Sequence, residues 1–170
     1  MSNIRIFEVG DILESEERYG LRVMAEEFAD FYNETLDEGW TYEVAEEYLL
    51  QLRELAGRFF LFAFDLGGGH YESVGFVGAR VKPKGSGKIL ADPEIFVREK
   101  YRGTGLHVGE QLYKELFARA RKMGIRTMEG VTYANEKGQP LNWYKNGFPG
   151  AEFYPELVNF SVPTDALGGE

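Results

Sequence analysis

The segment "YRGTGLHVGEQL", residues 101–112, contains residue types that bind phosphate groups. Gly103 and Gly105 can adopt positive φ angles and let a ligand approach the backbone closely. Arg102 can offer a planar guanidinium to phosphate oxygens, and a helix starting soon afterwards adds the partial positive charge of its N-terminus. The segment therefore predicts either a phosphate-binding loop or a plain turn ahead of an amphipathic helix.

The best-known nucleotide-binding loops have other patterns. Neither the P-loop pattern GxxxxGK[ST] nor the dinucleotide pattern GxGxxG occurs in the chain, which disfavours a kinase, a GTPase or a nicotinamide-dependent enzyme. The glycines at 67–69 are followed by no helix start, and we interpret them as a hairpin turn.

The inventory of reactive side chains excludes several kinds of chemistry. The chain has no cysteine, so disulfides, thiolate metal sites and cysteine nucleophiles are excluded. Its two histidines, His70 and His107, are too few for a multi-histidine metal site, and we predict no metal. Any chemistry must use carboxylates, tyrosines, hydroxyls and the backbone.

Length and composition are those of one ordinary globular domain. The chain has 170 residues, of which 44% are hydrophobic and 28% are charged. No stretch reaches the roughly 18 apolar residues of a membrane span, and the first ten residues lack the basic start and apolar core of a signal peptide. We therefore expect a soluble cytoplasmic protein that has no membrane partner.

The charge is unevenly distributed along the chain. A net charge of -9 argues against a nucleic-acid partner, because phosphate contacts need clustered positive charge. Residues 1–56 hold 15 acidic and 4 basic side chains, whereas residues 57–170 hold 13 and 15. One part could favour a cationic ligand and the other an anionic one. Alternatively, the acidic residues only solvate the outer faces of N-terminal helices.

The N-terminal third reads as a strand and two helices. The alternation in residues 4–9 predicts the strand, and apolar residues at three- and four-residue steps between Leu21 and Tyr32 predict the first helix. Thr41 is a predicted N-cap of the second helix, which Gly57 ends.

The remaining two thirds alternate strands and helices. Strands are expected at 58–65 and 72–81, then a basic connector at 82–88, and then a strand at 89–97 that Pro93 breaks, because proline cannot donate a ladder hydrogen bond. A helix from Val108 to Lys122 should end near Gly124. The last expected elements are a strand at 125–135, a helix at 138–148 and a strand at 155–162.

This order predicts an α+β (mixed α/β) fold. We expect a single domain over residues 1–163, with a central, mostly antiparallel twisted sheet flanked by helices, and a polar tail at 164–170.

The loop and the order of elements resemble the GNAT superfamily of N-acetyltransferases over residues 3–163. The superfamily signature is [Q/R]-x-x-G-x-[G/A], and Arg102 to Gly105 are similar to it, within a "V-x-x-x-Y-R-G" context that begins at Val97. The resemblance implies that this loop wraps the pyrophosphate of coenzyme A. The residues concerned are Arg102, Gly103, Thr104, Gly105, Leu106, His107 and Val108.

His107 departs from the superfamily pattern, which has glycine or alanine at that place. If "LH" is a two-residue insertion, the remainder fits, and the helix starts later, at Val108 and Gly109. Otherwise His107 lies beside the phosphates and changes their geometry.

A second resemblance lies near the C-terminus. Asn135 and the "YKNGF" of Tyr144 to Phe148 are similar to an asparagine after the fifth strand and to a helix ending "FYxxxGF". The tyrosine of that helix lies near the thioester sulfur, which implies Tyr144 as the acid, with Trp143 as a register-shifted alternative. Ordinary core packing is the competing interpretation of Tyr144.

The resemblance implies direct transfer of the acetyl group of acetyl-CoA to an amine. The backbone of the broken strand at Ile95, Phe96 and Val97 would bind pantetheine and polarise the carbonyl. A base must deprotonate the ammonium; we rank Glu94 first, with Glu129 and Asp92 as alternatives. Each of these carboxylates can equally be solvated or ion-paired.

The acceptor is expected to be a primary amine, either a small molecule or a peptide. Phe28, Phe31, Tyr32 and Trp40 are expected to help form its site, although core packing explains Phe28 and Phe31 more simply. Alternatives are a longer acyl group near Met24 and Met128, a non-catalytic acyl-CoA sensor, and a plain structural domain. Exposed edge strands make a homodimer plausible.

Overall fold

The computed structural model of the chain describes residues 3–36, 38–69, 71–132, 141–154, 159–165 and 167. The chain forms two compact units. The first, here called the loop unit, comprises Met1–Gly78 and Ile95–Leu112. The second, here called the tyrosine unit, comprises Ala79–Glu94 and Tyr113–Glu170.

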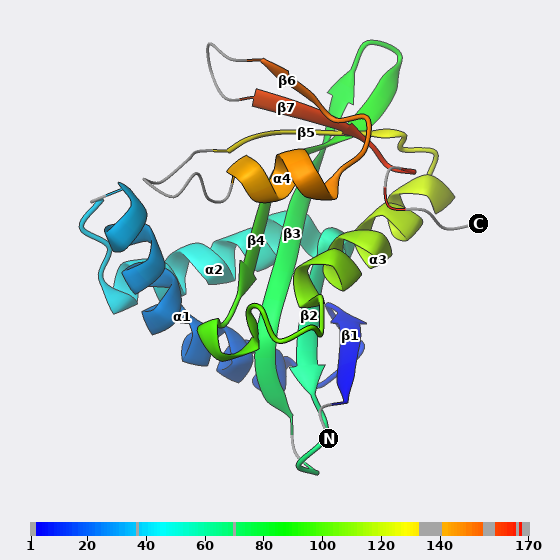
Figure 1. The fold of residues 1–170 in the computed structure, drawn as a ribbon. Helices are drawn as coiled ribbons and strands as arrows, with labels where there is room; N and C mark the ends of the chain where they lie inside the picture. The colour runs from blue at the N-terminus through cyan, green and yellow to red at the C-terminus, as the bar shows by residue number, and fades with distance from the viewer. Residues whose placement is uncertain are drawn as a thin grey trace. The chain divides into compact units, whose positions relative to one another are not determined.

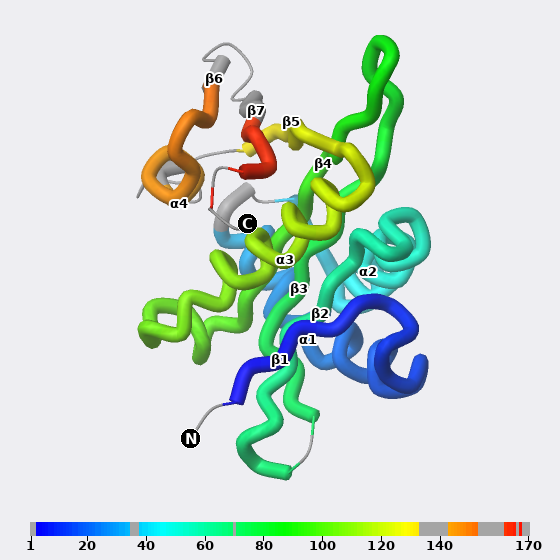
Figure 2. The backbone as a smooth tube through the Cα atoms, turned by 90° about the vertical axis from the view of Figure 1, so that its right-hand side faces the viewer, coloured from blue at the N-terminus to red at the C-terminus, as the bar shows by residue number. Residues whose placement is uncertain are grey.

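The loop unit is a small antiparallel sheet covered by two helices. Strand β1 (Ile4–Glu8) pairs with β2 (Phe60–Asp65), and β2 pairs with β3 (Glu72–Lys84). Figures 1 and 2 both show α1 (Glu14–Leu36) and α2 (Tyr42–Ala56) on the same face of β2 and β3.

Aromatic side chains fill the core of the loop unit. All of β2 except Asp65 is buried, and the Phe60 and Phe76 rings stack with centroids 5.2 Å apart. The Phe28 ring of α1 meets the Phe96 ring of β4 at 5.5 Å. Gly75 is required beside them, because a Cβ there would lie 2.4 Å from the Phe96 carbonyl oxygen. This packing fixes the end of β4 (Gly87–Val97) from which the glycine loop leaves.

Helix α1 begins earlier than the apolar spacing predicts. It starts at Glu14, and its first turn is acidic, which favours the helix dipole. The carboxylate of Glu17 is fully buried and accepts hydrogen bonds from the Gly10 N–H (2.7 Å) and from Arg53 on α2. Removing one member of such a pair typically costs about 3–5 kcal/mol. Glu17 is therefore part of the interior that joins α1 to α2, whereas Glu14 is exposed.

The predicted ends of α2 are confirmed. The Thr41 hydroxyl accepts a hydrogen bond from the Val44 N–H at 3.3 Å, and Gly57 adopts a φ of 53° at the C-terminus. A 3₁₀ turn, η1 (Gly57–Phe59), then leads directly into β2.

The tyrosine unit contains β4 as far as Glu94 and the three later strands, in the order β4-β5-β7-β6. Strand β5 (Thr127–Val131) pairs in parallel with β4 and antiparallel with β7 (Asn159–Pro163), which pairs antiparallel with β6 (Glu152–Tyr154). Figure 2 shows β5, β7 and β6 side by side. The helical parts are α4 (Leu141–Gly147) and most of α3 (Val108–Lys122).

Two local predictions in the C-terminal part are wrong. The segment at 82–88 is not a connector, because β3 continues to Lys84 and β4 starts at Gly87, with a tight turn at Gly85 between them. Strand β6 was not expected. The fold class is confirmed as a mixed α+β fold whose described strand pairs are antiparallel except for β4 and β5.

Candidate functional site

The glycine loop, defined as residues 102–108, has an open conformation. Gly103 and Gly105 have φ angles of 67° and 79°, and a Cβ added to either would meet no atom within 4 Å. The Thr104 hydroxyl donates to the Tyr101 carbonyl oxygen at 2.9 Å and closes the first turn of the loop. The glycines are therefore required by backbone conformation and not by crowding from neighbouring atoms.

The backbone N–H groups of the loop's second half are available to a ligand. Within the part of the chain that the structure describes, the N–H groups of residues 105–108 donate no hydrogen bond. Helix α3 begins at Val108, so its positive end lies beside these donors. The loop therefore fits an anionic group such as a pyrophosphate.

His107 occupies the turn immediately before α3, which agrees with the later helix start. Its φ of 50° is left-handed, and its carbonyl oxygen accepts the first helical hydrogen bond, from the Gln111 N–H at 3.0 Å. The imidazole is exposed, with Nδ1 3.7 Å from an oxygen of Glu110. The side chain thus points away from the protein interior, and the loop is not closed by it.

Two carboxylates anchor the base of the loop, where the 3₁₀ turn η2 (Glu99–Tyr101) follows β4. Glu27 of α1 accepts hydrogen bonds from Arg98 Nε at 2.7 Å and from the Glu99 N–H at 3.2 Å. Glu72 of β3 binds Lys100 and accepts a hydrogen bond from the Tyr101 hydroxyl at 3.1 Å. The loop is therefore tied to a helix and to a strand.

The same contacts shift the titration of two of these groups. Lys100, with smaller effects of Tyr101 and Arg98, holds the pKa of Glu72 below its ordinary value. Burial, reinforced by the neighbouring Glu72 carboxylate, raises the pKa of Tyr101 to about 12. At neutral pH the anchor therefore consists of an ionised Glu72 and a protonated tyrosine.

Arg102 is engaged within the loop unit. Its Nε donates to the Val97 carbonyl oxygen, and its guanidinium carbon lies 5.0 Å from the centre of the Phe31 ring and 5.1 Å from that of Phe96. Arg102, the predicted ligand of the phosphates, thus packs on two aromatic rings and bonds the strand that precedes the loop.

The backbone of β4 is irregular at Asp92, one residue before the predicted break at Pro93, although the strand continues to Val97. Asp92 has a left-handed φ of 52°, and the pairing of β4 with β5 is confined to Leu90 and Ala91. The Asp92 carboxylate accepts hydrogen bonds from Arg80 and Lys82, and Lys82, followed by Arg80, holds its pKa below its ordinary value. A carboxylate held by two cations is a poor base and suits a structural role.

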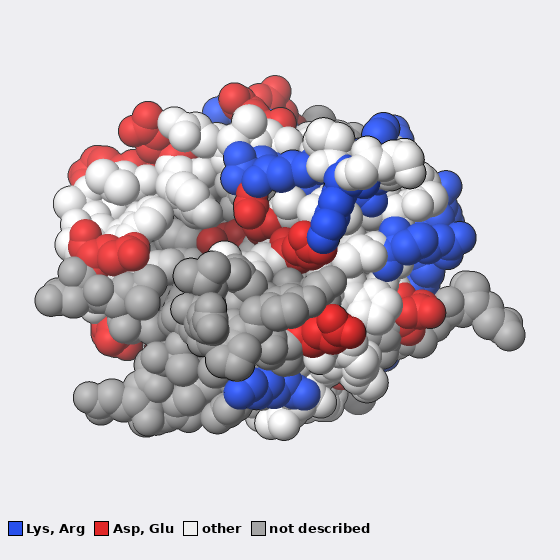
Figure 3. All heavy atoms as spheres, turned by 90° about the horizontal axis from the view of Figure 1, so that it is seen from above, with Lys and Arg blue, Asp and Glu red and all other residues white. Residues whose placement is uncertain are grey.

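The other two carboxylates considered as the base lie in different surroundings. Glu129 on β5 forms an ion pair with Lys84 of β3. Glu94 is half-buried on β4, two residues beyond the irregularity. Figure 3 shows basic side chains lying against acidic ones on the face that carries the hairpin of β3 and β4.

Tyr144 lies in an aromatic cluster of the tyrosine unit. Its side chain is 5% exposed, and its hydroxyl lies 2.7 Å from the hydroxyl of Tyr113 on α3. The rings of Trp143 and Phe148 pack against both tyrosines. The hydroxyl pair forms a buried hydrogen bond that can hold or pass a proton. Trp143, the alternative residue, is partly exposed.

A second polar group of the tyrosine unit lies at the end of β5. The hydroxyl of Thr132 is buried and, among the residues that the structure describes, has no hydrogen-bond partner. Leaving a hydroxyl in this state costs about 1–3 kcal/mol, so Thr132 is a group that a ligand could satisfy. Asn135 and His70 lie outside the described residues.

Sequence reasoning missed several residues that the structure brings to these sites. Tyr113, Glu27 and Glu72 had no role assigned to them from the sequence. The only available signal for Tyr113 was a tyrosine among buried helix positions, since a buried phenol hydroxyl usually has a polar partner. No signal in the sequence links Glu27 with Arg98, which lies 71 residues further along the chain.

The residues expected at the acceptor site are mostly core residues. Phe28 is fully buried, and around it lie the rings of Tyr32, Trp40, Tyr48, Phe76 and Phe96. Phe31, Tyr32 and Trp40 are half-buried. Trp40 is held in place by Asn33, whose side chain bonds both its N–H and its carbonyl oxygen. Core packing thus accounts for Phe28, while the other three present part of their surface.

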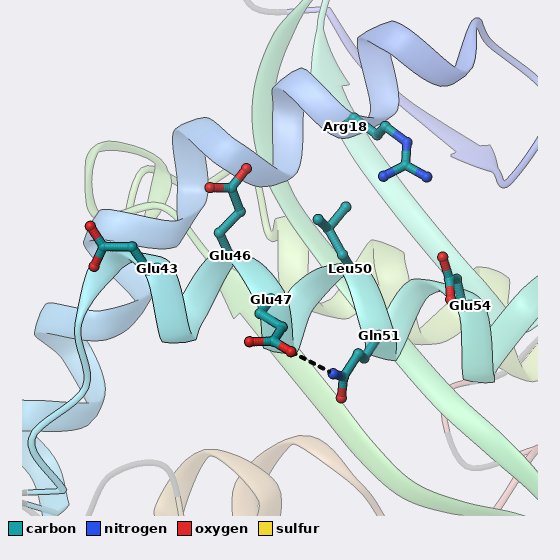
Figure 4. A pocket seen from close by; sticks show the side chains of 7 residues that line it. All are labelled: Arg18, Glu43, Glu46, Glu47, Leu50, Gln51 and Glu54. Carbon is teal, nitrogen blue, oxygen red and sulfur yellow. Dashed lines mark hydrogen bonds between the residues drawn. The ribbon is translucent and has the colours of Figure 1, made fainter.

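The acidic charge of the N-terminal region gathers on the outer face of α2. A groove of about 410 Å³ lies there, lined by Arg18, Glu43, Glu46, Glu47, Leu50, Gln51 and Glu54 (Figure 4). Glu46 pairs with Arg22, and Glu47 accepts a hydrogen bond from Gln51. The buried residues of α2 are on its opposite face, so this groove is a solvated helix surface.

Two further classes of site were sought among the described residues. Within them, no group of three or more His, Cys, Asp and Glu side chains is arranged to hold a metal ion. None of the helices described is long and apolar enough to cross a membrane.

Comparison with solved structures identifies proteins of the same fold. The NatC complex bound to Gag peptide and CoA is 16% identical, with a TM-score of 0.61, and covers 95% of this chain and 98% of the other. The PH1933 protein of Pyrococcus horikoshii OT3 is 19% identical (TM-score 0.62; 95% and 98%). PaiA N-acetyltransferase of Thermoplasma acidophilum in complex with coenzyme A is 19% identical (TM-score 0.60; 95% and 99%).

Comparison with curated proteins finds no match. The sequence profile of the Acetyltransferase (GNAT) family matches residues 21–148, which include the anchor Glu27, the whole glycine loop and Tyr144. The match covers well over half of the chain and ends at Phe148, the last residue of the "YKNGF" segment. This protein therefore belongs to the GNAT family of acetyltransferases.

Proposed function

We propose that the protein is an N-acetyltransferase that moves the acetyl group of acetyl-CoA directly to a primary amine of a small molecule or peptide. The observation that carries the proposal is the glycine loop, whose donors at residues 105–108 face no protein acceptor among the described residues. In a GNAT family chain, this loop is the place for a pyrophosphate.

Residues of the loop unit would bind the cosubstrate. The N–H groups of residues 105–108 would donate to the pyrophosphate, with Gly103 and Gly105 giving it access to the backbone. The backbone of Ile95, Phe96 and Val97 would bond the pantetheine amides, and an N–H there would polarise the acetyl carbonyl. Asn135 and the Thr132 hydroxyl, which has no hydrogen-bond partner among the described residues, are proposed as further ligands of the cosubstrate.

The acceptor nitrogen must lose two protons, and the thiolate must gain one. We assign removal of the ammonium proton to Glu94, which passes it to solvent. The neutral amine nitrogen then attacks the carbonyl carbon of the thioester, the carbon–sulfur bond breaks, and the nitrogen gives its second proton to Glu94, leaving an amide and a thiolate. Tyr144 protonates the thiolate and regains a proton from solvent, while Tyr113 stabilises the Tyr144 phenolate through their hydrogen bond, 2.7 Å long.

The choice of Glu94 and Tyr144 is supported by what surrounds the alternatives. Asp92 and Glu129 each form ion pairs with lysine or arginine side chains. Glu94 is half-buried on β4 and immediately precedes Ile95, whose backbone is proposed to bind the cosubstrate.

Calorimetric titration tests the proposal first. Wild-type protein is titrated with acetyl-CoA and with CoA, and the titrations are repeated with Gly105→Glu, which places a carboxylate in the loop. Binding by the wild type that the substitution abolishes supports the pyrophosphate site, and thiol release from acetyl-CoA in the presence of a panel of amines then identifies the acceptor class. Wild-type protein that binds neither ligand contradicts the proposal.

The alternative is a non-catalytic acyl-CoA sensor on the same fold. It is distinguished by turnover, because a sensor binds acetyl-CoA but releases no CoA with any amine, and Tyr144→Phe changes nothing. The cytoplasmic location and the homodimer stay predictions from the sequence.

A further inference from the structure

Arg102 makes contacts that conflict with its expected role at the phosphates. Its guanidinium lies over the rings of Phe31 and Phe96, with distances of 5.0 and 5.1 Å to the ring centres, and its Nε donates to the Val97 carbonyl oxygen. All four residues belong to the loop unit. The side chain therefore turns back toward α1 and β4 instead of toward the donors at residues 105–108.

The surface that receives Arg102 is rigid. Phe96 is 3% exposed and is fixed among core rings, and the half-buried Phe31 packs against it with ring centres 6.2 Å apart. An arginine stacked on aromatic faces keeps its charge and loses little side-chain entropy on binding there. Because Val97 ends β4, the hydrogen bond also occupies a carbonyl at the end of the strand.

This position competes with both halves of the cosubstrate. The family resemblance implies Arg102 as a ligand of the pyrophosphate, and the proposed function gives the Val97 backbone a contact with pantetheine. Nε of Arg102 holds the Val97 carbonyl oxygen, so a pantetheine N–H that bonds this oxygen would compete with Arg102. A guanidinium that moves to the pyrophosphate would likewise leave its place on Phe31 and Phe96.

We propose that Phe31 and Phe96 hold Arg102 as a latch across the end of β4, and that the pyrophosphate of the cosubstrate releases it. Phe31 is then a positioning residue, which acts on cosubstrate binding through Arg102 and not by contact. The latch rests on the proposed function. It also implies an order of binding, because the Phe31 face on α1 becomes accessible to an acceptor only after the cosubstrate has bound.

Arg102→Met tests the latch because it should change the affinities for CoA and for pantetheine in opposite directions. For CoA, the variant loses a charge-assisted phosphate contact, and we expect binding about tenfold weaker. For pantetheine, which has no pyrophosphate, the variant no longer blocks the Val97 carbonyl, and we expect binding about two- to fivefold tighter. An arginine that served only as a phosphate ligand would leave the affinity for pantetheine unchanged, and that result overturns the latch.

Phe31→Leu tests the aromatic support, with Phe31→Tyr as the matched control that keeps the ring. Leucine should tighten CoA binding about two- to fivefold, the size of one exposed cation–π contact, and tyrosine should restore the wild-type affinity. In the Arg102→Met background, Phe31→Leu should have no effect on CoA affinity. An equal effect in both backgrounds means that Phe31 acts on the fold and overturns the latch.

The side-chain NMR signal of the Arg102 Nε–H group follows the latch directly. In the wild-type protein the ring currents of Phe31 and Phe96 should shift it, and saturation with CoA should remove that shift. An unchanged signal in the CoA-saturated protein overturns the release step alone. If neither the wild type nor Phe31→Leu binds CoA, the proposed function is overturned together with the latch. If both bind CoA and the Arg102 signal is unchanged, only the latch is overturned.

Discussion

The glycine loop and helix α4 hold their functional groups by different forces. The loop offers backbone N–H groups, and its base is fixed by the carboxylates of Glu27 and Glu72. Helix α4 offers the Tyr144 hydroxyl, which is fixed by aromatic packing and by one neutral hydrogen bond from another tyrosine. One region is held by charge and the other by apolar contact.

The difference follows from what each region is proposed to bind. The backbone N–H groups that the loop presents to a pyrophosphate are uncharged, and carboxylates at its base neutralise Arg98 and Lys100. A tyrosine that gives up a proton needs a dry, fixed hydroxyl, which aromatic neighbours supply. The loop should therefore respond to pH and salt, and the tyrosine cluster to changes in packing.

Tyr144→Phe should have the largest effect. The substitution keeps the ring in the cluster and removes only the proposed acid, so kcat should fall about 100- to 1,000-fold, while the dissociation constant for CoA stays the same. Steady-state kinetics and calorimetry on the same preparation measure both values. An unchanged kcat would show that Tyr144 serves only in the packing of the aromatic cluster.

Tyr113→Phe is the matched control within the same hydrogen bond. It leaves the Tyr144 hydroxyl in place without its partner, and we expect kcat to fall about tenfold, the order of one buried hydrogen bond of 1–1.5 kcal/mol. The alkaline limb of the pH–rate profile should shift with it. A loss as large as that of Tyr144→Phe would assign the acid to Tyr113 instead.

Gly105→Ala should come next. The φ of 79° is strained for alanine by about 1–2 kcal/mol, although the added Cβ meets no atom within 4 Å. We expect CoA binding to weaken about tenfold, because the loop relaxes away from the conformation that directs its donors. Gly85→Ala, at a φ of 58° in the hairpin turn of β3 and β4, should cost similar stability and leave CoA affinity unchanged. Equal losses of affinity in both variants would contradict a specific role for the loop.

Glu72→Gln should weaken CoA binding about two- to fivefold through the base of the loop, a size expected for a partly exposed charged contact. The pKa of Glu72 is lowered in the folded protein, so its contribution to stability is present above the ordinary value near 4.5 and is lost as pH falls through the folded value. Denaturant unfolding across that range should therefore show a smaller pH dependence in the variant. Glu14→Gln, which removes a surface pair with Arg18, is the control and should leave CoA affinity unchanged.

The smallest effect concerns the titration of Tyr101. Its folded pKa of about 12 lies above the ordinary value, so the contribution of its protonated form is complete below pH 10 and is lost as pH rises toward the folded value. Glu72→Gln should lower this pKa partway toward 10, since burial, the larger cause, remains. Ultraviolet absorbance titration of the phenolate, with Tyr101→Phe to identify the signal, measures the change. An unchanged pKa of Tyr101 in Glu72→Gln would show that Glu72 does not act on the base of the loop.

Local features were predictable because neighbouring residues produce them. The Thr41 cap, the end of α2 at Gly57 and the start of α3 at Val108 each depend on a few consecutive residues. The early start of α1 was missed because Glu17 reads as a surface residue. Its burial depends on Arg53, which lies 36 residues away in sequence.

By itself, the sequence determined the α+β class, the glycine loop and the absence of cysteine chemistry, since these follow from local patterns and composition. Only the tertiary structure decided the irregular backbone of β4 at Asp92, the pairing of Tyr144 with Tyr113 and the place of Arg102 on Phe31 and Phe96. Each of these depends on side chains that are distant in sequence and meet only when strands and helices pack. A local sequence pattern cannot predict these contacts, because the energy of each contact depends on a partner that is distant in the sequence.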